Sequence, residues 1–98
     1  MELVQDRPAE PWTVGTLAAA VGSSRAAFAR RFHALVGQPP MQYLTEWRLS
    51  LAADALREPG VGLAEVAGRV GYATPFALSA AFKRVRGVTP SDFRRRTA

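Results

Sequence analysis

Apolar residues recur along this chain mainly at intervals of three and four, the spacing that lets a helix bury one face. No window alternates apolar and polar residues over more than a few positions, so the pattern does not favour strands. The sequence therefore predicts an all-α protein. We expect helices at Val14–Val21, Arg25–Val36, Met41–Arg57, Leu63–Val70 and Pro75–Arg86, and a short final helix that begins at Pro90.

Residues that start and stop helices support these limits at the second and fifth helices. Ser24 is placed to cap the second helix, and Gly37 is placed to end it. Thr74 followed by proline at the first helical position is an equally clear start for the fifth helix, which Gly87 ends.

The second half of the chain repeats the pattern of the first half. The matched pairs are Leu17 and Val66, Ala18 and Ala67, Val21 and Val70, Gly22 and Gly71, Phe28 and Leu78, Phe32 and Phe82, Gly37 and Gly87, Pro40 and Pro90, and Tyr43 and Phe93. Each copy contains two short helices separated by a turn that opens on a glycine. The repeat predicts two helix-turn-helix heads, over residues 12–40 and 62–96, joined by a linker helix over residues 41–58. Such heads point to DNA.

The second helix of each head has an apolar face and an opposite face of small and basic residues. We expect the apolar faces to be buried, with Trp12 and Trp47 in the core as well. These faces comprise Phe28, Phe32, Leu35 and Val36 in the first head, and Leu78, Phe82 and Val85 in the second. The outer faces comprise Ala26, Ala27, Ala29, Arg30 and His33, and Phe76, Ala77, Ser79, Ala80 and Lys83.

The net charge of +5 is concentrated on these two helices and on the C-terminal tail. Neither helix contains an acidic residue, although solvated helix surfaces usually mix both signs. One such alanine-rich helix is most simply explained as facing solvent. Two of them, each after a glycine turn and each free of acids, favour a polyanionic partner.

Other classes of function have little support. The chain contains no cysteine, which removes disulfides and thiolate sites and is typical of a cytoplasmic protein. His33 has no second histidine or cysteine with which to hold a metal, so we expect no metal and no cofactor. No carboxylate pair or phosphate-binding glycine loop indicates an enzyme. No apolar run is long enough for a membrane span, and the acidic N-terminus does not resemble a signal peptide.

The linker helix is long enough for the two heads to contact two grooves of one DNA duplex. Residues 41–57 at about 1.5 Å each span roughly 25 Å. With the width of the two heads added, the outer faces come to lie on the order of 34 Å apart, which is one turn of B-DNA. One chain is therefore expected to enter two successive major grooves.

These residues resemble the DNA-binding domain of the AraC/XylS-type bacterial transcription regulators, over about Trp12 to Arg96. In the second half the resemblance rests on Gly71-Tyr72, Phe82-Lys83-Arg84, Gly87-Val88-Thr89-Pro90 and Phe93-Arg94. In the first half it rests on Ser24-Arg25, Phe28, Phe32, Gly37, Pro40, Tyr43-Leu44, Arg48 and Ala52.

The resemblance implies a sequence-specific transcription factor whose second helix in each head contacts DNA. By position, the implied contacts of the first head are Ser24, Arg25, Ala26, Ala29 and Arg30. Those of the second head are Thr74, Pro75, Phe76, Ser79, Ala80, Lys83 and Arg84. The resemblance also implies RNA polymerase as a partner, and an N-terminal effector-binding or dimerisation domain outside this chain, which looks like the C-terminal part of a larger regulator.

Two positions depart from the family pattern. Ala80 stands where arginine is frequent, and Phe76 stands where a polar residue is usual. We therefore expect the first head to supply most base discrimination. The second head would mainly contact phosphates, through Lys83, Arg84 and the amides at Thr74, and Phe76 would offer an apolar contact such as that with a thymine methyl.

Two further groups of arginines have open roles. Arg48 is expected either to pair with a nearby acid or to contact the backbone of a head. Arg94–Arg96 are expected either to contact phosphates or to form a solvated tail. The alternative to DNA binding is a helical protein-interaction module, in which Phe76 and neighbouring alanines form a patch for a partner protein.

Overall fold

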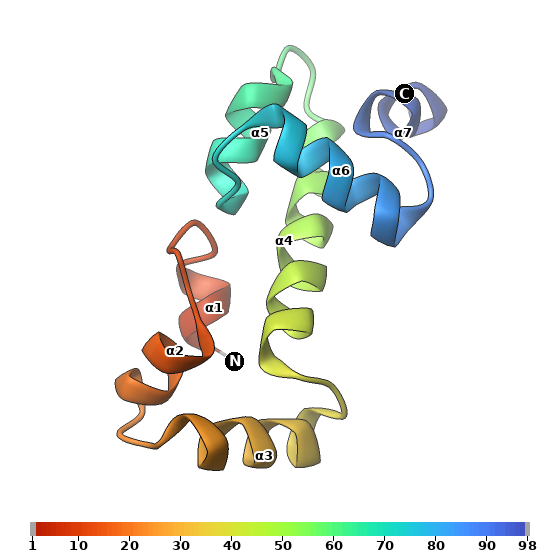
Figure 1. Ribbon diagram of the computed structural model, residues 1–98. Coiled ribbons are helices and arrows are strands. Elements are labelled where there is room, and N and C mark those ends of the chain that lie inside the picture. The colour runs from red at the N-terminus through yellow and green to blue at the C-terminus, as the bar shows by residue number, and fades with distance from the viewer. Residues whose placement is uncertain (1, 98) are drawn as a thin grey trace.

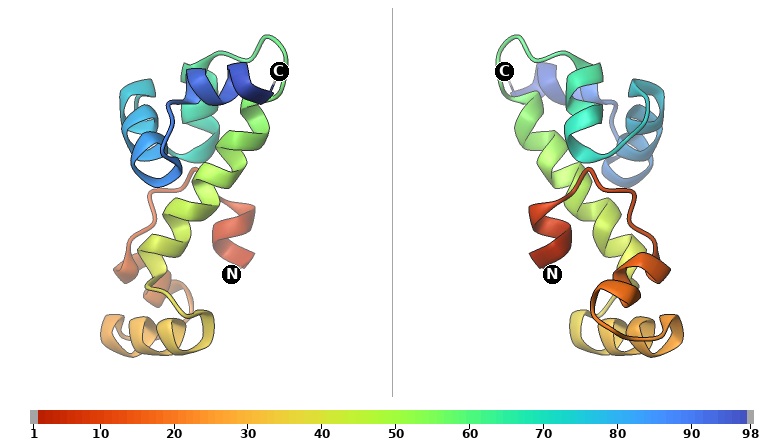
Figure 2. Two further views of the ribbon diagram at one scale, coloured as in Figure 1. Left: turned by 90° about the vertical axis from the view of Figure 1, so that its right-hand side faces the viewer. Right: turned by 90° about the vertical axis from the view of Figure 1, so that its left-hand side faces the viewer.

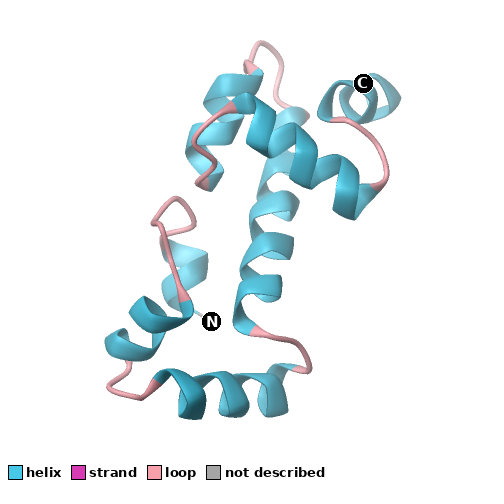
Figure 3. Cartoon of the chain, viewed as in Figure 1, coloured by secondary structure: helices cyan, strands magenta, loops and turns pink. Residues whose placement is uncertain are grey.

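The computed structural model describes residues 2–97, which contain helices and loops but no strand (Figure 3). The helices are α1 (Glu2–Asp6), α2 (Val14–Ala20), α3 (Arg25–Val36), α4 (Pro40–Leu56), α5 (Leu63–Val70), α6 (Pro75–Arg86) and α7 (Pro90–Thr97). The all-α prediction is confirmed. The five helices predicted with both limits agree with those observed to within about a residue, and α7 begins at Pro90 as predicted. Only α1 has no counterpart among the predicted helices.

The long helix α4 runs between two groups of helices (Figures 1 and 2). At one end lie α2 and α3, with α1 beside them, and at the other end lie α5, α6 and α7. The described residues measure 42 × 21 × 20 Å along their principal axes. The predicted architecture of two helix-turn-helix heads on a linker helix is therefore confirmed.

Each head has its own apolar core, and α4 contributes to both. In the first head Leu17, Phe28, Phe32 and Leu44 pack together, and the indole rings of Trp12 and Trp47 pack against that core. A second cluster lies at the other end of α4, and its buried members are Leu49, Ala52, Ala53, Ala55, Leu56, Val66, Ala67, Val70, Leu78, Ala81 and Phe82. Because both cores share one continuous helix, the linker fixes how the heads are separated.

Small residues in the second half of α4 let three helices approach it. Ala52, Ala53 and Ala55 are all buried, and α5, α6 and α7 each contact α4. Alanine is also the residue with the highest helix propensity, so close packing and helix formation favour the same choice here. None of the described helices is both long and apolar enough to cross a bilayer.

The prediction that Leu35, Val36 and Val85 are buried is wrong. Their exposed fractions are 86%, 43% and 44%. All three lie in the last turn of α3 or α6, one turn beyond the aromatic residue that enters the core. The periodicity identifies the apolar side of a helix but not how far a neighbouring helix covers it.

Val21 differs from its repeat partner: Val70 is 2% exposed, whereas Val21 is 53% exposed. The helix α2 ends at Ala20, and Val21 is its C-cap, with φ of −108° and ψ of 11°. Val21 therefore does not continue the helix, and its side chain does not extend the buried face formed by Leu17 and Ala18.

The segment that precedes α2 contacts the first core and the linker helix. Val4 of α1 is only 1% exposed and belongs to the first core. The Arg48 side chain on α4 donates hydrogen bonds from Nε to the Pro8 carbonyl at 2.9 Å and from Nη2 to the Glu10 carbonyl at 2.6 Å. Arg48 therefore binds backbone carbonyls, which is one of its two expected roles. The carbonyls belong to the N-terminal segment rather than to a head. Arg48 pairs with no acid in the described range.

Candidate nucleic-acid interface

In each head the second helix follows a turn with a left-handed glycine. Gly22 has φ of +68° and Gly71 has φ of +91°, a region that glycine enters easily because it lacks a Cβ. A side-chain cap then starts the helix. Ser24 Oγ accepts a hydrogen bond at 3.3 Å, and Thr74 Oγ1 accepts one at 3.1 Å, each from the amide three residues further on. The hydroxyls of both predicted site residues thus fix where α3 and α6 begin.

The outer face of α3 carries the predicted contacts of the first head. Ala26 and Arg30 are exposed, and Ala29 is half-buried at the edge of the face. Arg25 is exposed as well, but its side chain leans on α2, since a Cβ added at Gly15 would lie 3.0 Å from Arg25 Nε. The guanidinium of Arg25 therefore lies close to the backbone of α2 at Gly15.

The outer face of α6 carries the predicted contacts of the second head. Its most prominent member is Phe76, the second residue of the helix, which is 87% exposed. Among the other predicted contacts on α6, Ala80, Lys83 and Arg84 are exposed, whereas Pro75 and Ser79 are half-buried. The face therefore combines one large apolar ring, small residues and two cations.

Four cations on these faces are unpartnered. Arg25, Arg30, Lys83 and Arg84 form no hydrogen bond or ion pair with any residue that the structure describes. Neither α3 nor α6 contains a carboxylate. Because like charges held close together repel, such a surface is electrostatically complementary to a polyanion.

Other basic residues on the same helices are already engaged. Arg31 Nη2 donates to Ser23 Oγ at 2.8 Å, which ties α3 to the preceding turn. Arg86 Nη2 donates to Ser50 Oγ at 3.2 Å, which ties α6 to α4. The positive charge counted along the sequence thus divides into structural cations and cations that remain free for a ligand.

Arg94 fulfils neither of the two roles expected of the C-terminal arginines. Its Nε donates to the Leu56 carbonyl at 2.8 Å, and its Nη2 donates to the Val61 carbonyl at 2.7 Å. The half-buried side chain thereby closes the loop between α4 and α5. Arg95 pairs with Asp92, and this hydrogen bond holds the pKa of Asp92 below its ordinary value. Arg96 is exposed.

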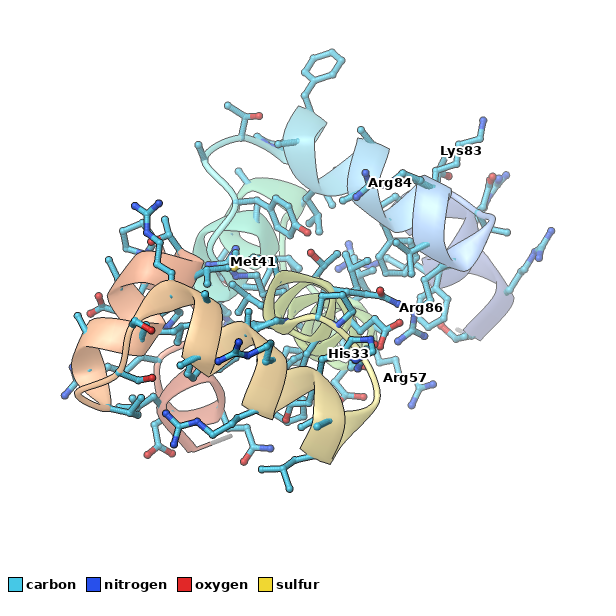
Figure 4. The ribbon with its side chains drawn as sticks, turned by 60° about the horizontal axis from the view of Figure 1, so that its bottom comes forward. His33, Met41, Arg57, Lys83, Arg84 and Arg86 are labelled. Atoms are coloured by element: carbon cyan, nitrogen blue, oxygen red, sulfur yellow. The ribbon has the colours of Figure 1, made fainter. Side chains whose placement is uncertain are left out.

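Figure 4 shows the ribbons of both second helices together. In that view α3 and α6 are in full view and run in the same sense, and α4 is seen nearly along its axis between them. His33 on α3 and Lys83 and Arg84 on α6 project from these helices, whereas Arg86 extends back toward α4. The two heads thus present their second helices on a common side.

The sequence did not indicate three of the structural roles found here. Arg31, Arg86 and Arg94 form hydrogen bonds with partners in other elements or turns, and no local spacing marks them. Their partners lie up to 38 residues away in the sequence. The one sequence feature near these residues is the repeat, because Arg86 and Arg94 are adjacent to the repeated residues Gly87 and Phe93.

Comparisons with known proteins agree with this geometry. Residues 17–96 match the family described as a helix-turn-helix domain. A putative AraC-like transcription regulator of Streptomyces antibioticus is 52% identical over 88 residues, which cover 90% of this chain and 29% of the relative. The regulator AlkR of Acinetobacter baylyi is 37% identical over 90 residues, covering 92% of this chain and 29% of the relative.

A similar solved structure is the DNA-binding domain of AdpA in complex with a target DNA. It is 36% identical in sequence, the TM-score is 0.90, and the match covers 96% of this chain and 85% of that one. The chain spans only about 29% of the length of the two curated relatives that it matches.

Proposed function

The chain belongs to the AraC-type helix-turn-helix family of bacterial transcription regulators, and on that basis we propose that it binds double-stranded DNA sequence-specifically through α3 and α6. The observation that carries the proposal is the set of unpartnered cations Arg25, Arg30, Lys83 and Arg84, on two acid-free helices of a common side. The similar AdpA domain is itself bound to a target DNA.

The two helices enter successive major grooves on one face of the duplex. The long axis of the described residues measures 42 Å. One turn of B-DNA is about 34 Å. The described residues are therefore long enough along one axis to span one turn of the duplex.

The first head supplies most of the base discrimination. Arg30 presents an unpartnered guanidinium from the middle of α3, and arginine recognises guanine through two hydrogen bonds in the major groove. The base-facing positions of α6 offer no guanidinium, because they are occupied by Ala80 and by Ser79, which is half-buried. The second head contributes mainly phosphate contacts through Lys83, Arg84 and the amides at the start of α6.

The remaining expected partners belong to the same proposal. As part of a transcription regulator, the domain acts on chromosomal DNA in the bacterial cytoplasm and works with RNA polymerase. The proposal also includes an effector-binding or dimerisation domain on the N-terminal side of this one; what supports a further domain is that the two relatives are more than three times as long as the matched segment.

Selection of bound duplexes from a random pool tests the proposal directly. We expect two conserved half-sites whose centres are about one helical turn apart, with more information in the half-site of the first head. A single conserved half-site, or two at a different spacing, would contradict the placement in successive grooves.

The salt dependence of binding separates DNA recognition from the protein-interaction module. With roughly six phosphate contacts, the logarithm of the affinity should fall with the logarithm of salt concentration at a slope of about −5. The selected duplex should also bind far more tightly than a scrambled duplex of the same composition. Weak binding that is insensitive to salt and to sequence would favour the protein-interaction module instead.

A further inference from the structure

Among the residues that the structure describes, Phe76 is the one aromatic side chain that lies open to solvent. It is 87% exposed, whereas Phe28, Phe32 and Phe82 are at most 8% exposed. The remaining aromatic residues all pack against one of the two cores. Phe76 therefore lacks the apolar burial that stabilises the other described aromatic rings.

The ring stands on the face of α6 that points away from the core. Phe76, Ala80 and Lys83 are four and three residues apart, so they share one side of the helix. The buried Leu78 and Phe82 lie on the opposite side. Ala80 is small enough to let this face approach a ligand closely, and Lys83 remains unpartnered next to it.

The position of the ring along the helix places it at base edges. In helix-turn-helix proteins the N-terminal residues of the second helix contact bases, and Phe76 is the second residue of α6. A phenyl ring offers no hydrogen-bond donor or acceptor. In the major groove the apolar group that a standard base pair presents is the 5-methyl group of thymine.

We infer that Phe76 recognises the 5-methyl group of a thymine in the half-site of the second head, an inference that rests on the function proposed above. The second head thereby gains base discrimination without a guanidinium. The contact selects thymine through apolar burial, whereas Arg30 in the first head selects through hydrogen bonds.

Two other uses of the ring fit the surface less well. Insertion between base steps from the minor groove would require α6 to enter a groove about 6 Å wide, although a helix is about 10 Å across. A protein partner would have to cover Phe76 together with Lys83 and Arg84, two cations that form no ion pair with the described residues. A duplex satisfies the ring and the cations at once.

Replacement of thymine by deoxyuridine tests the inference, because uracil keeps every hydrogen-bonding group of thymine and lacks only the methyl. The probe is the duplex selected by this chain, with each thymine of the second half-site replaced in turn. One replacement should weaken binding by roughly fourfold, the equivalent of about 0.8 kcal/mol for one buried methyl group.

Two variants assign that effect to the ring. With Phe76→Ala the thymine and uracil duplexes should bind equally at the sensitive position, and with Phe76→Leu most of the difference should remain. Uracil at thymines of the first half-site serves as the control, since its effect should be the same in all three proteins. Because the side chain is 87% exposed and belongs to neither core, both variants should keep the helical circular dichroism of the parent.

The inference is overturned if no thymine in the second half-site is sensitive, or if Phe76→Ala keeps the difference. Either result leaves the proposed function intact as long as the chain still selects a duplex and binds it with a steep salt dependence. Failure to select any duplex would instead overturn the proposed function.

Discussion

The guanidinium of Arg48 lies against the backbone of Gly71, where the linker helix, the second head and the N-terminal segment meet. A Cβ added at Gly71 would lie 3.0 Å from both Nε and Nη2 of Arg48, and 2.7 Å from the Pro8 carbonyl oxygen. The same guanidinium lies 6.0 Å from the centre of the Tyr72 ring. Arg48 therefore holds the N-terminal segment against the turn that positions α6.

Gly71→Ala should destabilise the protein more than any other glycine-to-alanine change in a left-handed turn. The residue has φ of +91°, and its new methyl group would collide with the backbone of Pro8. We expect a loss of about 3 kcal/mol in the free energy of unfolding, from backbone strain and the collision together. Chemical unfolding measures it.

Gly37→Ala is the matched control for that change. Gly37 has φ of +87°, yet a Cβ there would have no atom within 4 Å. The control should therefore cost only the backbone strain, about 1 kcal/mol. Equal losses for the two variants would show that the contact between Gly71 and the N-terminal segment contributes nothing to stability.

Removal of the Arg48 side chain should free the N-terminal segment. Arg48→Ala deletes the two hydrogen bonds to the carbonyls of Pro8 and Glu10, so we expect a loss of about 2 kcal/mol and faster amide exchange at Trp12. Arg57→Ala at the C-cap of the same helix is the control, because that exposed side chain only lies over the Phe93 ring, at 5.8 Å. It should cost less than about 1 kcal/mol.

Tyr72 should make the protein less stable in alkaline solution. Burial raises the pKa of its phenol above the ordinary value of about 10. The folded state therefore holds the proton more tightly than the unfolded state does, and this stabilisation is present below about pH 10 and is lost as the pH rises through the folded pKa. Tyr72→Phe should flatten that decline when the free energy of unfolding is followed with pH. An unchanged decline would contradict the assignment.

The helices of this fold could be predicted closely because their signals are local. Ser24 and Thr74 cap the helices they were expected to cap, and Gly37 and Gly87 end those helices in the left-handed conformation. Caps, prolines and glycines act within one turn of a helix, so their effects can be inferred from neighbouring residues alone.

What the sequence could not provide depends on contacts between distant segments. Leu35 has the spacing of a core residue but lies beyond the reach of α2 and α4, and this depends on the angle at which α4 leaves α3. Arg94 has the composition of a tail residue but binds the carbonyls of Leu56 and Val61. No residue of the outer faces of α3 and α6 is buried, in agreement with the prediction from periodicity, whereas their contact with DNA stays a prediction.

Arg30→Ala and Arg84→Ala should weaken DNA binding in different ways. Arg30 is expected to contact a base, so its loss should cost about 1–3 kcal/mol on the selected duplex and relax the preference at one base pair. Arg84 is expected to contact phosphate, so its loss should weaken selected and scrambled duplexes alike and reduce the salt slope by about one.

Competition between duplexes that differ at single base pairs measures both effects. Both side chains are exposed and unpartnered in the described range, so the stability of each variant should stay within about 0.5 kcal/mol of the parent. Equal loss of specificity in the two variants would contradict the division between base and phosphate contacts.

Ala80→Arg should strengthen binding by the second head. Ala80 is exposed one turn beyond Phe76 on the same face of α6, and no carboxylate on this helix would capture a new guanidinium. The added side chain should steepen the salt slope by about one and create a preference for guanine at one base pair of the second half-site. Ala9→Arg adds the same charge in an exposed loop outside both heads and should create no such preference. If Ala80→Arg left both affinity and preference unchanged, the outer face of α6 would not be the surface that meets the duplex.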